Sequence, residues 1–190
     1  MPVSPGRRIR NPELHREAIL AAAAQSFAER GYQQATIRDI ARRAGVTHGL
    51  VLRHFGSKEQ LFLAAVPGTR DVAELGQGPP ETLPERLATG YVNRMENAAG
   101  GDAFLALVRS AGSDDDSATR LLLAMQERTL DTYRAQLGKA KAEQLLPFIA
   151  SLLIGVTFSR YIVRAGFLAE MDRETFTEHL THALRGLIAA

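Results

Sequence analysis

TIRDIARRAGVTHGLVLRHFGSK, residues 36–58, is the stretch that decides the fold, because it places two short helices around a tight turn. Thr36 and Asp39 have the spacing of a capping box, in which side chains satisfy the free amides of a first helical turn. From Ile37 to Ala44, apolar residues recur at i, i+3, i+4 and i+7, which indicates one buried helical face. The segment therefore begins with a short capped helix.

A turn and a second helix complete the unit. Gly45 supplies the permissive backbone that ends the first helix, and Val46 can fold back onto its apolar face. The second helix is expected from Thr47 to about Phe55. A capped helix, a Gly-Val turn and a further helix form a helix-turn-helix.

The surface of this unit is strongly basic. Only Asp39 and Glu59 oppose its cations, whereas a solvated helix face usually mixes signs more evenly. A basic second helix suits a DNA major groove, where phosphates supply affinity and base edges supply specificity. A helical hairpin with an arginine-rich exterior is the alternative that the pattern leaves open. The cations are Arg38, Arg42, Arg43, Arg53 and Lys58.

Two further helices frame the unit. Asn11-Pro12-Glu13 is a helix start, with an N-cap residue, a proline at the first position and an acid in the first turn. This helix should end at Gly31 and bury Phe27 against Ile40 and Phe55. Ser57 and Gln60 form another capping box, which opens a fourth helix that runs to Val66.

These motifs resemble those of a known family. T-I-x-x-I-A-x-x-A-G-V-T-x-G, followed by H-F-x-S-K-E-x-L, resembles the DNA-binding segment of TetR/AcrR-type transcriptional repressors. AILAAAAQSFAERGY (residues 18–32) is similar to the first helix of that family. The resemblance covers about the first 65 residues. Leu52 departs from it, because the family often carries a Tyr there that reaches the DNA backbone, so Arg53 or His54 must supply that contact or it is lost.

The resemblance implies a role for each residue of the helix-turn-helix. Thr36, His54 and Lys58 would contact phosphates, and Gly49 would allow close approach to the duplex. Lys58 also lies at the positive end of a helix, where its charge and the helix dipole add. The residues nearest the base edges would be Arg38, Thr47, His48, Leu50 and Arg53.

Composition and charge narrow the class of protein. The 190 residues include no cysteine, which excludes disulfides, thiolate zinc sites and thiol nucleophiles. No uninterrupted apolar run approaches 18 residues and no secretory signal is evident, so we expect a cytoplasmic protein without a membrane span. Residues 1–66 hold 10 Lys and Arg against 5 Asp and Glu, and residues 67–190 hold 13 against 16. A basic first third and an acidic remainder indicate nucleic-acid binding at one end only.

We therefore predict an all-α chain of about nine helices, with an N-terminal three-helix DNA-binding domain and a larger C-terminal helical bundle. The predicted organisation is a flexible basic arm (1–10, with Arg7, Arg8 and Arg10), the helix-turn-helix domain (11–56), a linking helix and connector (57–82) and a ligand-binding and dimerisation domain (83–190). A turn of helix is expected near 72–75. The predicted bundle helices span about 83–99, 102–111, 116–138, 141–166 and 172–189, with a kink at Pro147.

Residues 145–168 are apolar nearly all round, which favours burial both by the bundle and by a second subunit. A symmetric dimer also reads a palindrome, which one short helix cannot do. In the resembled family the last two helices pair with their twofold mates. We therefore predict a homodimer through roughly 145–188. Its interface residues would be Leu152, Gly155, Val156, Ser159, Leu180, Ala183, Leu184 and Leu187.

A ligand pocket inside the bundle is predicted from residue types alone. Soft apolar and polar-tipped side chains suit an apolar or aromatic small molecule that is anchored by a few hydrogen bonds. Arg94 and Arg109 could pair with an acidic ligand, but surface ion pairs are the role expected for them. The resemblance implies that ligand binding shifts the helix from Ser57 to Val66 and releases DNA. The candidate ligand residues are Tyr91, Met95, Phe104, Met125, Thr129, Tyr133, Phe158 and Tyr161.

Other functions find less support in the sequence. His179 and His182 lack a third metal ligand, Asp114–Asp116 lacks the spacing of a calcium loop, and no glycine-rich phosphate loop follows a strand. We expect no metal, no cofactor and no catalysis. The alternatives left open are a helical DNA-binding or interaction protein without a small-molecule inducer and, with less support, a helical enzyme.

Overall fold

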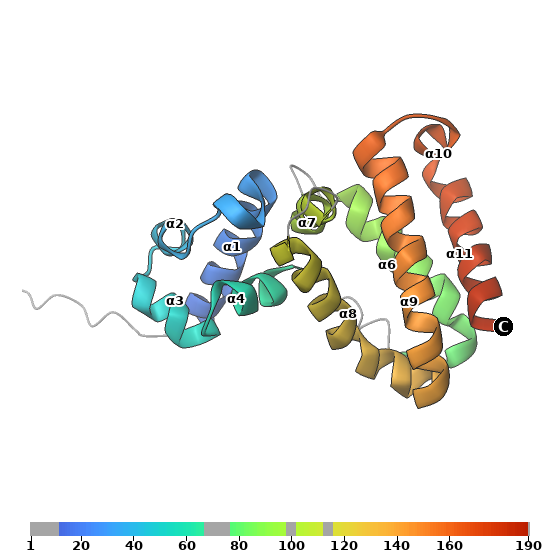
Figure 1. The fold of residues 1–190 in the computed structure, drawn as a ribbon, viewed down its shortest axis with the longest axis horizontal. Coiled ribbons are helices and arrows are strands. Elements are labelled where there is room, and N and C mark those ends of the chain that lie inside the picture. Colours follow the sequence, from blue (N-terminus) through green and yellow to red (C-terminus); the bar gives the residue numbers. More distant parts are fainter. Residues whose placement is uncertain (1–11, 67–76, 98–101, 112–115, 190) are drawn as a thin grey trace, which may run out of the picture.

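A computed structural model describes residues 12–66, 77–97, 102–111 and 116–189 (Figure 1). These ranges hold ten α-helices and no strand, which confirms the all-α prediction. The arm at 1–10 and the helical turn expected near 72–75 lie outside the described residues. The helices are α1 (Pro12–Gln34), α2 (Ile37–Arg43), α3 (His48–Phe55), α4 (Lys58–Ala65), α6 (Leu83–Asn97), α7 (Ala103–Ala111), α8 (Asp116–Leu137), α9 (Lys139–Val156), α10 (Phe167–Glu170) and α11 (Arg173–Ala189).

The chain forms an N-terminal head, α1–α4, and a bundle, α6–α11. Figure 1 shows the head at one end, α9 and α11 at the other, and α7 and α8 between them. Helix α1 packs on α7, and α4 contacts α8. The head is thus attached to the bundle through two helices rather than by a linker alone.

Local side-chain caps shape the head as the sequence predicts. The Thr36 hydroxyl accepts a hydrogen bond from the Asp39 amide (3.1 Å) and donates one to the Asp39 carboxylate (2.8 Å). Thr47 caps α3 through the amide of Leu50 (3.2 Å), and Ser57 caps α4 in the same way. Gly45 has φ 67°, a left-handed backbone that glycine adopts without strain.

The first helix differs slightly from its prediction. Gly31 interrupts the helical backbone with φ 73° and ψ 170°, but one further turn continues to Gln34. The turn holds Tyr32 against the head core, where its ring lies 5.3 Å from that of Phe62. The Phe27 ring meets Phe62 at 4.9 Å. Ile40 and Phe55 belong to the same cluster, as expected.

Buried side chains form two clusters in the described residues. The first, which we call the head core, joins α1–α4 to Leu107 of α7 and Leu121 of α8. The second, the bundle core, joins α6, α9 and α11 with the tyrosine of α8, Tyr133. Phe104 of α7 packs against both clusters. The two cores therefore meet at α7 and α8.

The long apolar helix begins two residues earlier than predicted and changes its winding near its end. Residues Thr157–Val163 form a π-helical segment, which Arg164 ends with a left-handed φ of 54°. A π-helix rotates the side chains that follow it relative to a continuous α-helix, because each turn holds more residues. The faces predicted for residues 157–163 from an α-helical period are consequently displaced.

An arginine holds the chain that follows this segment. Arg160 donates hydrogen bonds to the carbonyls of Leu168 and Met171, each at 2.7 Å, and pairs with Glu96 at 3.0 Å. Its guanidinium lies 4.3 Å from the centroid of the Phe176 ring. The short helix α10, absent from the sequence prediction, is thereby fixed against the π-helical segment.

Candidate nucleic-acid interface and ligand cavity

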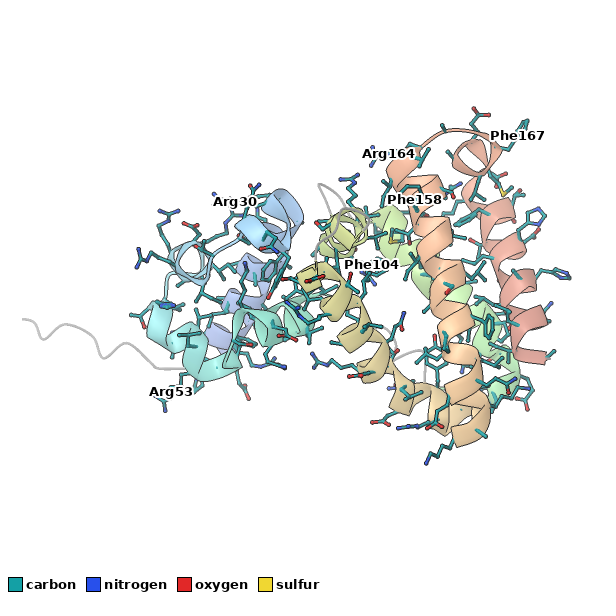
Figure 2. All side chains as sticks on the ribbon, in the orientation of Figure 1. Arg30, Arg53, Phe104, Phe158, Arg164 and Phe167 are labelled. Atoms are coloured by element: carbon teal, nitrogen blue, oxygen red, sulfur yellow. The ribbon has the colours of Figure 1, made fainter. Side chains whose placement is uncertain are left out.

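One face of α3 is open to solvent. Val51 is buried and fixes the helix to the head core, while Thr47, His48 and Gly49 at the N-terminal end are exposed. A Cβ atom placed on Gly49 would meet no atom of the described residues within 4 Å, so this position is uncrowded in the described part of the chain. Leu50 and His54 are half-buried, and Arg53 is exposed at the outer edge of the head (Figure 2).

Several arginines of the head are held by carboxylates. Arg42 and Arg30 both pair with Asp39, at 2.7 and 3.3 Å, and Arg43 pairs with Glu29 at 2.7 Å. The hydrogen bond from Thr36, followed by the charges of Arg42 and Arg30, lowers the pKa of Asp39. Asp39 therefore stays ionised and holds the end of α1 against α2.

Arg38 and Arg53 differ from these neighbours. Both are exposed, and neither forms an ion pair or hydrogen bond with another residue of the described ranges. Their guanidiniums keep their full hydrogen-bonding capacity for a partner outside the chain. They are the two residues expected to read base edges.

Lys58 already has a partner inside the protein. Its ammonium donates to the Gln33 carbonyl at 3.0 Å and lies 4.5 Å from the centroid of the Tyr32 ring. Burial lowers its pKa. Lys58 thus ties the start of α4 to the end of α1, and a phosphate contact would have to replace or extend these interactions.

A cavity of about 140 Å³ lies where the head core and the bundle core meet. Leu63 and Val66 bring the end of α4 and the residue after it into its wall, opposite Tyr91 of α6 and Ile149 of α9. Phe104 contributes from α7; Figure 2 shows it between the head and the bundle. One wall of the cavity therefore belongs to the helix that directly follows α3.

Five of the eight residues chosen for ligand contact line this cavity, and three do not. Met95 is buried in the bundle core, Phe158 is 50% exposed, and the Tyr161 hydroxyl donates to Glu96 at 3.1 Å. These three side chains therefore do not line this cavity, and ligand contact through them stays a prediction. Phe158 and Tyr161 would continue the cavity-lining face of Ile154 in an α-helix, but the π-helical segment turns them away. The five that line it are Tyr91, Phe104, Met125, Thr129 and Tyr133.

Residues that the prediction missed make up most of the wall. Leu63, Leu146 and Leu153 are apolar helix positions with the same pattern as ordinary core, so the sequence carried no signal for them. Arg94 and Gln126 also line the cavity. Arg94 was expected in a surface ion pair, but its pair with Asp102 (3.2 Å) is largely buried, with 15% and 5% of the two side chains exposed.

The tyrosines of the cavity differ in their partners. The Tyr91 hydroxyl lies 2.8 Å from the hydroxyl of Thr157, the first residue of the π-helical segment. Tyr133 is 5% exposed and forms no hydrogen bond with any described residue. Burial raises the pKa of both groups. Both are therefore neutral at physiological pH, and only Tyr133 has a hydroxyl without a partner in the described chain.

The predicted dimer residues divide into two sets. Leu180 and Leu184 are buried in the subunit's own bundle core, where α11 packs on α6, so their assignment to a dimer interface is corrected. The apolar stripe of α11 turns inward because α6 offers it an apolar partner. Leu152, Gly155, Val156, Ser159, Ala183 and Leu187 keep exposed or half-exposed surface.

The helix Lys139–Val163 is long and apolar enough to cross a membrane by length and composition, with a mean hydropathy of 1.7. The sequence alone predicted no membrane span, because no uninterrupted apolar run approaches 18 residues. An apolar helix of a soluble protein passes the same test, and such a helix alone does not indicate a membrane protein. Only 17% of its most apolar window is buried within the single chain. Two large apolar side chains of this helix, Phe148 and Phe158, are exposed in the single chain.

In the described ranges, no three His, Cys, Asp or Glu side chains gather as a metal site would require.

Two family models together match most of the chain. Residues 19–65 match the model for bacterial regulatory proteins of the tetR family, and residues 81–188 match the tetracyclin repressor-like C-terminal domain. The first match covers most of the head, and the second covers nearly all of the bundle.

Individual relatives agree with these models. HTH-type transcriptional repressor Rv3405c of Mycobacterium tuberculosis is 49% identical over 71 residues, which are 36% of this chain and 38% of that protein. HTH-type transcriptional activator FasR of Mycolicibacterium smegmatis is 36% identical over 99 residues, 52% of this chain and 42% of that protein. The matched segments thus span less than half the length of these relatives.

Solved structures extend the likeness over the whole chain. A TetR-family regulator from Streptomyces coelicolor has a TM-score of 0.68 at 28% identity, over 97% of this chain and all of that one. The fatty acid degradation regulator FadR from Bacillus halodurans has a TM-score of 0.65 at 18% identity, over 90% and 97% of the two chains, which shows a shared fold.

Proposed function

The chain belongs to the tetR family of bacterial regulatory proteins, and from this we propose that it is a cytoplasmic, ligand-responsive transcriptional repressor that binds a palindromic operator as a homodimer. The names of its relatives indicate a regulator rather than an enzyme. The observation that carries the proposal is the exposed face of α3. Arg53 on this face and Arg38 on the neighbouring α2 are exposed and form no ion pair or hydrogen bond with another described residue.

In the proposed complex, α3 enters the major groove with its N-terminal end toward the bases. Arg38 and Arg53 each pair with a guanine, whose O6 and N7 atoms match a guanidinium in a bidentate contact. Leu50 meets a thymine methyl group, and Thr36 and His54 contact phosphates. The choice of Arg38 and Arg53 as base readers is supported by the ion pairs of Arg42 and Arg43, because those pairs engage Arg42 and Arg43 within the head.

Selection of bound duplexes from a random pool tests this proposal. The purified chain should enrich a palindrome whose half-sites lie about 34–36 Å apart or at a multiple of that distance. Binding that prefers no duplex sequence over heparin would overturn the proposal. The double variant Arg38→Ala/Arg53→Ala should retain its helical content but no longer enrich the palindrome.

We propose that two subunits meet through the outer face of α9 and the exposed side of α11. The small fraction of α9 that a single chain buries, and the exposed Phe148 and Phe158, support this face as an interface. Gly155 offers a sharp test, because a Cβ atom there meets nothing within 4 Å in the single chain. Gly155→Glu therefore leaves the subunit fold intact but would bury a charge at the interface.

Sedimentation velocity should show a dimer for the unmodified chain and a monomer for Gly155→Glu. Ala140→Glu is the matched control, since Ala140 is exposed on the same helix outside the proposed interface and should leave the dimer intact. A monomeric unmodified chain at micromolar concentration, or an unaffected Gly155→Glu dimer, would contradict this interface.

Ligand response is proposed to act through α4. Leu63 of α4 and Val66, the residue after it, line the cavity, and only two residues separate the start of α4 from the end of α3. A ligand that pushes on these side chains would tilt α4 and move the two α3 helices out of groove register. A coupling free energy of about 1–3 kcal/mol would suffice for a useful switch.

Thermodynamic linkage between ligand binding and operator binding provides a test of the proposed ligand response. A ligand that binds the cavity should raise the melting temperature of the free protein and weaken its operator binding. A ligand that stabilises the protein and leaves operator affinity unchanged would show that the cavity is not coupled to α3. The chain would then be a DNA-binding protein without an inducer.

A further inference from the structure

The cavity holds one hydroxyl that lacks a partner in the described chain. Tyr133 extends from α8 into the bundle core and lines the cavity, and no residue of the described ranges hydrogen-bonds its hydroxyl. Thr129, one turn away, instead satisfies its own hydroxyl on the Gln126 carbonyl at 2.8 Å. A tyrosine hydroxyl can both donate and accept a hydrogen bond, so one at a cavity wall offers a partner to a polar group that enters the cavity. The Tyr133 hydroxyl is thus placed to bind a group that enters the cavity.

The charge of the cavity wall is already balanced. The Arg94 guanidinium lies 3.3 and 3.2 Å from the two carboxylate oxygens of Asp102 and stacks 5.0 Å from the Phe104 ring centroid. Asp102 also accepts the Phe104 amide at 2.6 Å, which fixes the carboxylate at the start of α7. A carboxylate ligand would have to displace Asp102 from a largely buried pair, so the wall disfavours anions.

Size and lining limit the ligand further. An apolar cavity of about 150 Å³ in another protein accommodates benzene, and this cavity is about 140 Å³. Phe104 offers a ring face, and Leu87, Met125 and Leu146 supply aliphatic and thioether surface. A single aromatic ring fits this volume and these surfaces.

We propose that the cavity binds a neutral, single-ring phenol whose hydroxyl hydrogen-bonds to Tyr133. A phenol hydroxyl can donate or accept, so it matches the tyrosine hydroxyl in either direction. This assignment deepens the proposed ligand response and rests on it for its biological meaning, although binding itself can be measured without DNA.

Calorimetry on the full-length protein with three probes tests the assignment. Phenol and toluene have the same number of non-hydrogen atoms and differ in the hydroxyl, and benzoate adds a negative charge. Phenol should bind at least about tenfold more tightly than toluene, which corresponds to one hydrogen bond to the cavity. Benzoate should bind more weakly than both.

Tyr133→Phe should remove the preference for phenol, so that phenol binds no more tightly than toluene, while toluene binding is not weakened. Tyr161→Phe is the matched control, because the Tyr161 hydroxyl bonds to Glu96 outside the cavity. An unchanged ratio of phenol to toluene affinity in Tyr133→Phe would overturn the assignment. So would tightest binding of benzoate, or no binding of phenol.

Operator binding measured without probes separates this inference from the proposed function. If phenol binds through Tyr133 and the protein enriches no operator, the inference stands and the proposed function fails. If the operator is bound and phenol is not, the inference fails while the DNA-binding proposal stands.

Discussion

The head core and the bundle core are both apolar, but they treat polar groups differently. The head core is closed around Phe27, Phe62 and Tyr32, and the ion pairs of the head lie on its surface. The bundle core borders a cavity where it meets the head core, and the ion pair Arg94–Asp102 beside it is largely out of water. A filled core suits a unit that must keep its shape, and a core with a void and buried polar groups suits one that must accept a molecule.

The largest effects should come from emptying the two cores. Phe27→Ala should destabilise the protein by about 3–5 kcal/mol, because it removes a fully buried ring and leaves a void. Phe176→Ala should cost a similar amount in the bundle core, where that ring is also buried. Chemical denaturation followed by circular dichroism measures both.

The same pair of variants tests how separate the cores are. Helices α7 and α8 link the head core to the bundle, so one cooperative transition is expected in each variant. If Phe27→Ala unfolds the head in a distinct early transition and leaves the bundle folded, the two cores are separate cooperative units.

The next largest effect should come from the buried ion pair. Asp102→Asn retains an acceptor for the Phe104 amide but leaves the Arg94 charge uncompensated in a largely buried site, which should cost about 3 kcal/mol. Asp39→Asn in the head breaks exposed pairs and should cost clearly less. If both variants lost the same unfolding free energy, the buried pair of the bundle and the exposed pairs of the head would not differ in their contribution to stability.

Substitution of cations with and without partners inside the head should change DNA affinity in different ways. Arg38→Ala and Arg53→Ala should each weaken operator binding by about 1–3 kcal/mol and relax specificity at one base position. Lys58→Ala should weaken binding to all sequences alike. Fluorescence anisotropy with operator and single-base variants measures these changes. Uniform loss from all three substitutions would show that the base-reading residues are misassigned.

The head was predictable because its determinants are local. The Thr36–Asp39 box, the turn at Gly45 and the Ser57 cap each join residues at most a few positions apart, so spacing alone specified them. The partners of Arg43 and Lys58 were not predictable, because Glu29 and Gln33 lie on another helix. Whether a cation is available to DNA therefore depends on its contacts with other helices as much as on its position in the helix-turn-helix motif.

The bundle was less predictable because its arrangement depends on contacts between helices that are distant in sequence. An apolar stripe on α11 does not reveal whether α6 or a second subunit covers it, and Leu180 and Leu184 turned out to face α6. The helical period failed after Val156 because the π-helical segment shifts the register, which misplaced Phe158 and Tyr161. Residue type did identify Tyr91 and Tyr133, since a tyrosine combines an aromatic ring with a polar tip, which suits the wall of a ligand cavity.

A smaller effect is expected at alkaline pH in the bundle. Burial raises the pKa of Tyr161 from an ordinary value near 10 to about 12. The pKa of Tyr161 is higher in the folded state than in the unfolded state. Its contribution to the free energy of unfolding is therefore fully present below pH 10 and is lost as the pH rises toward 12. Tyr161→Phe should flatten the fall of unfolding free energy over that window. Ultraviolet absorbance of tyrosinate follows the titration, and an unshifted midpoint would contradict the burial.

The smallest effect is expected at acid pH in the head, where the sign is opposite. The Thr36 hydroxyl, then the charges of Arg42 and Arg30, lower the pKa of Asp39 from 3.8. A depressed folded pKa contributes stability above 3.8 that disappears as pH falls through the lowered value. Thr36→Ser keeps the hydroxyl and should preserve this pKa, whereas Thr36→Val should raise it. Because the carboxylate is near solvent, salt should weaken the arginine contribution and leave that of Thr36, and carbon NMR of the carboxylate measures both.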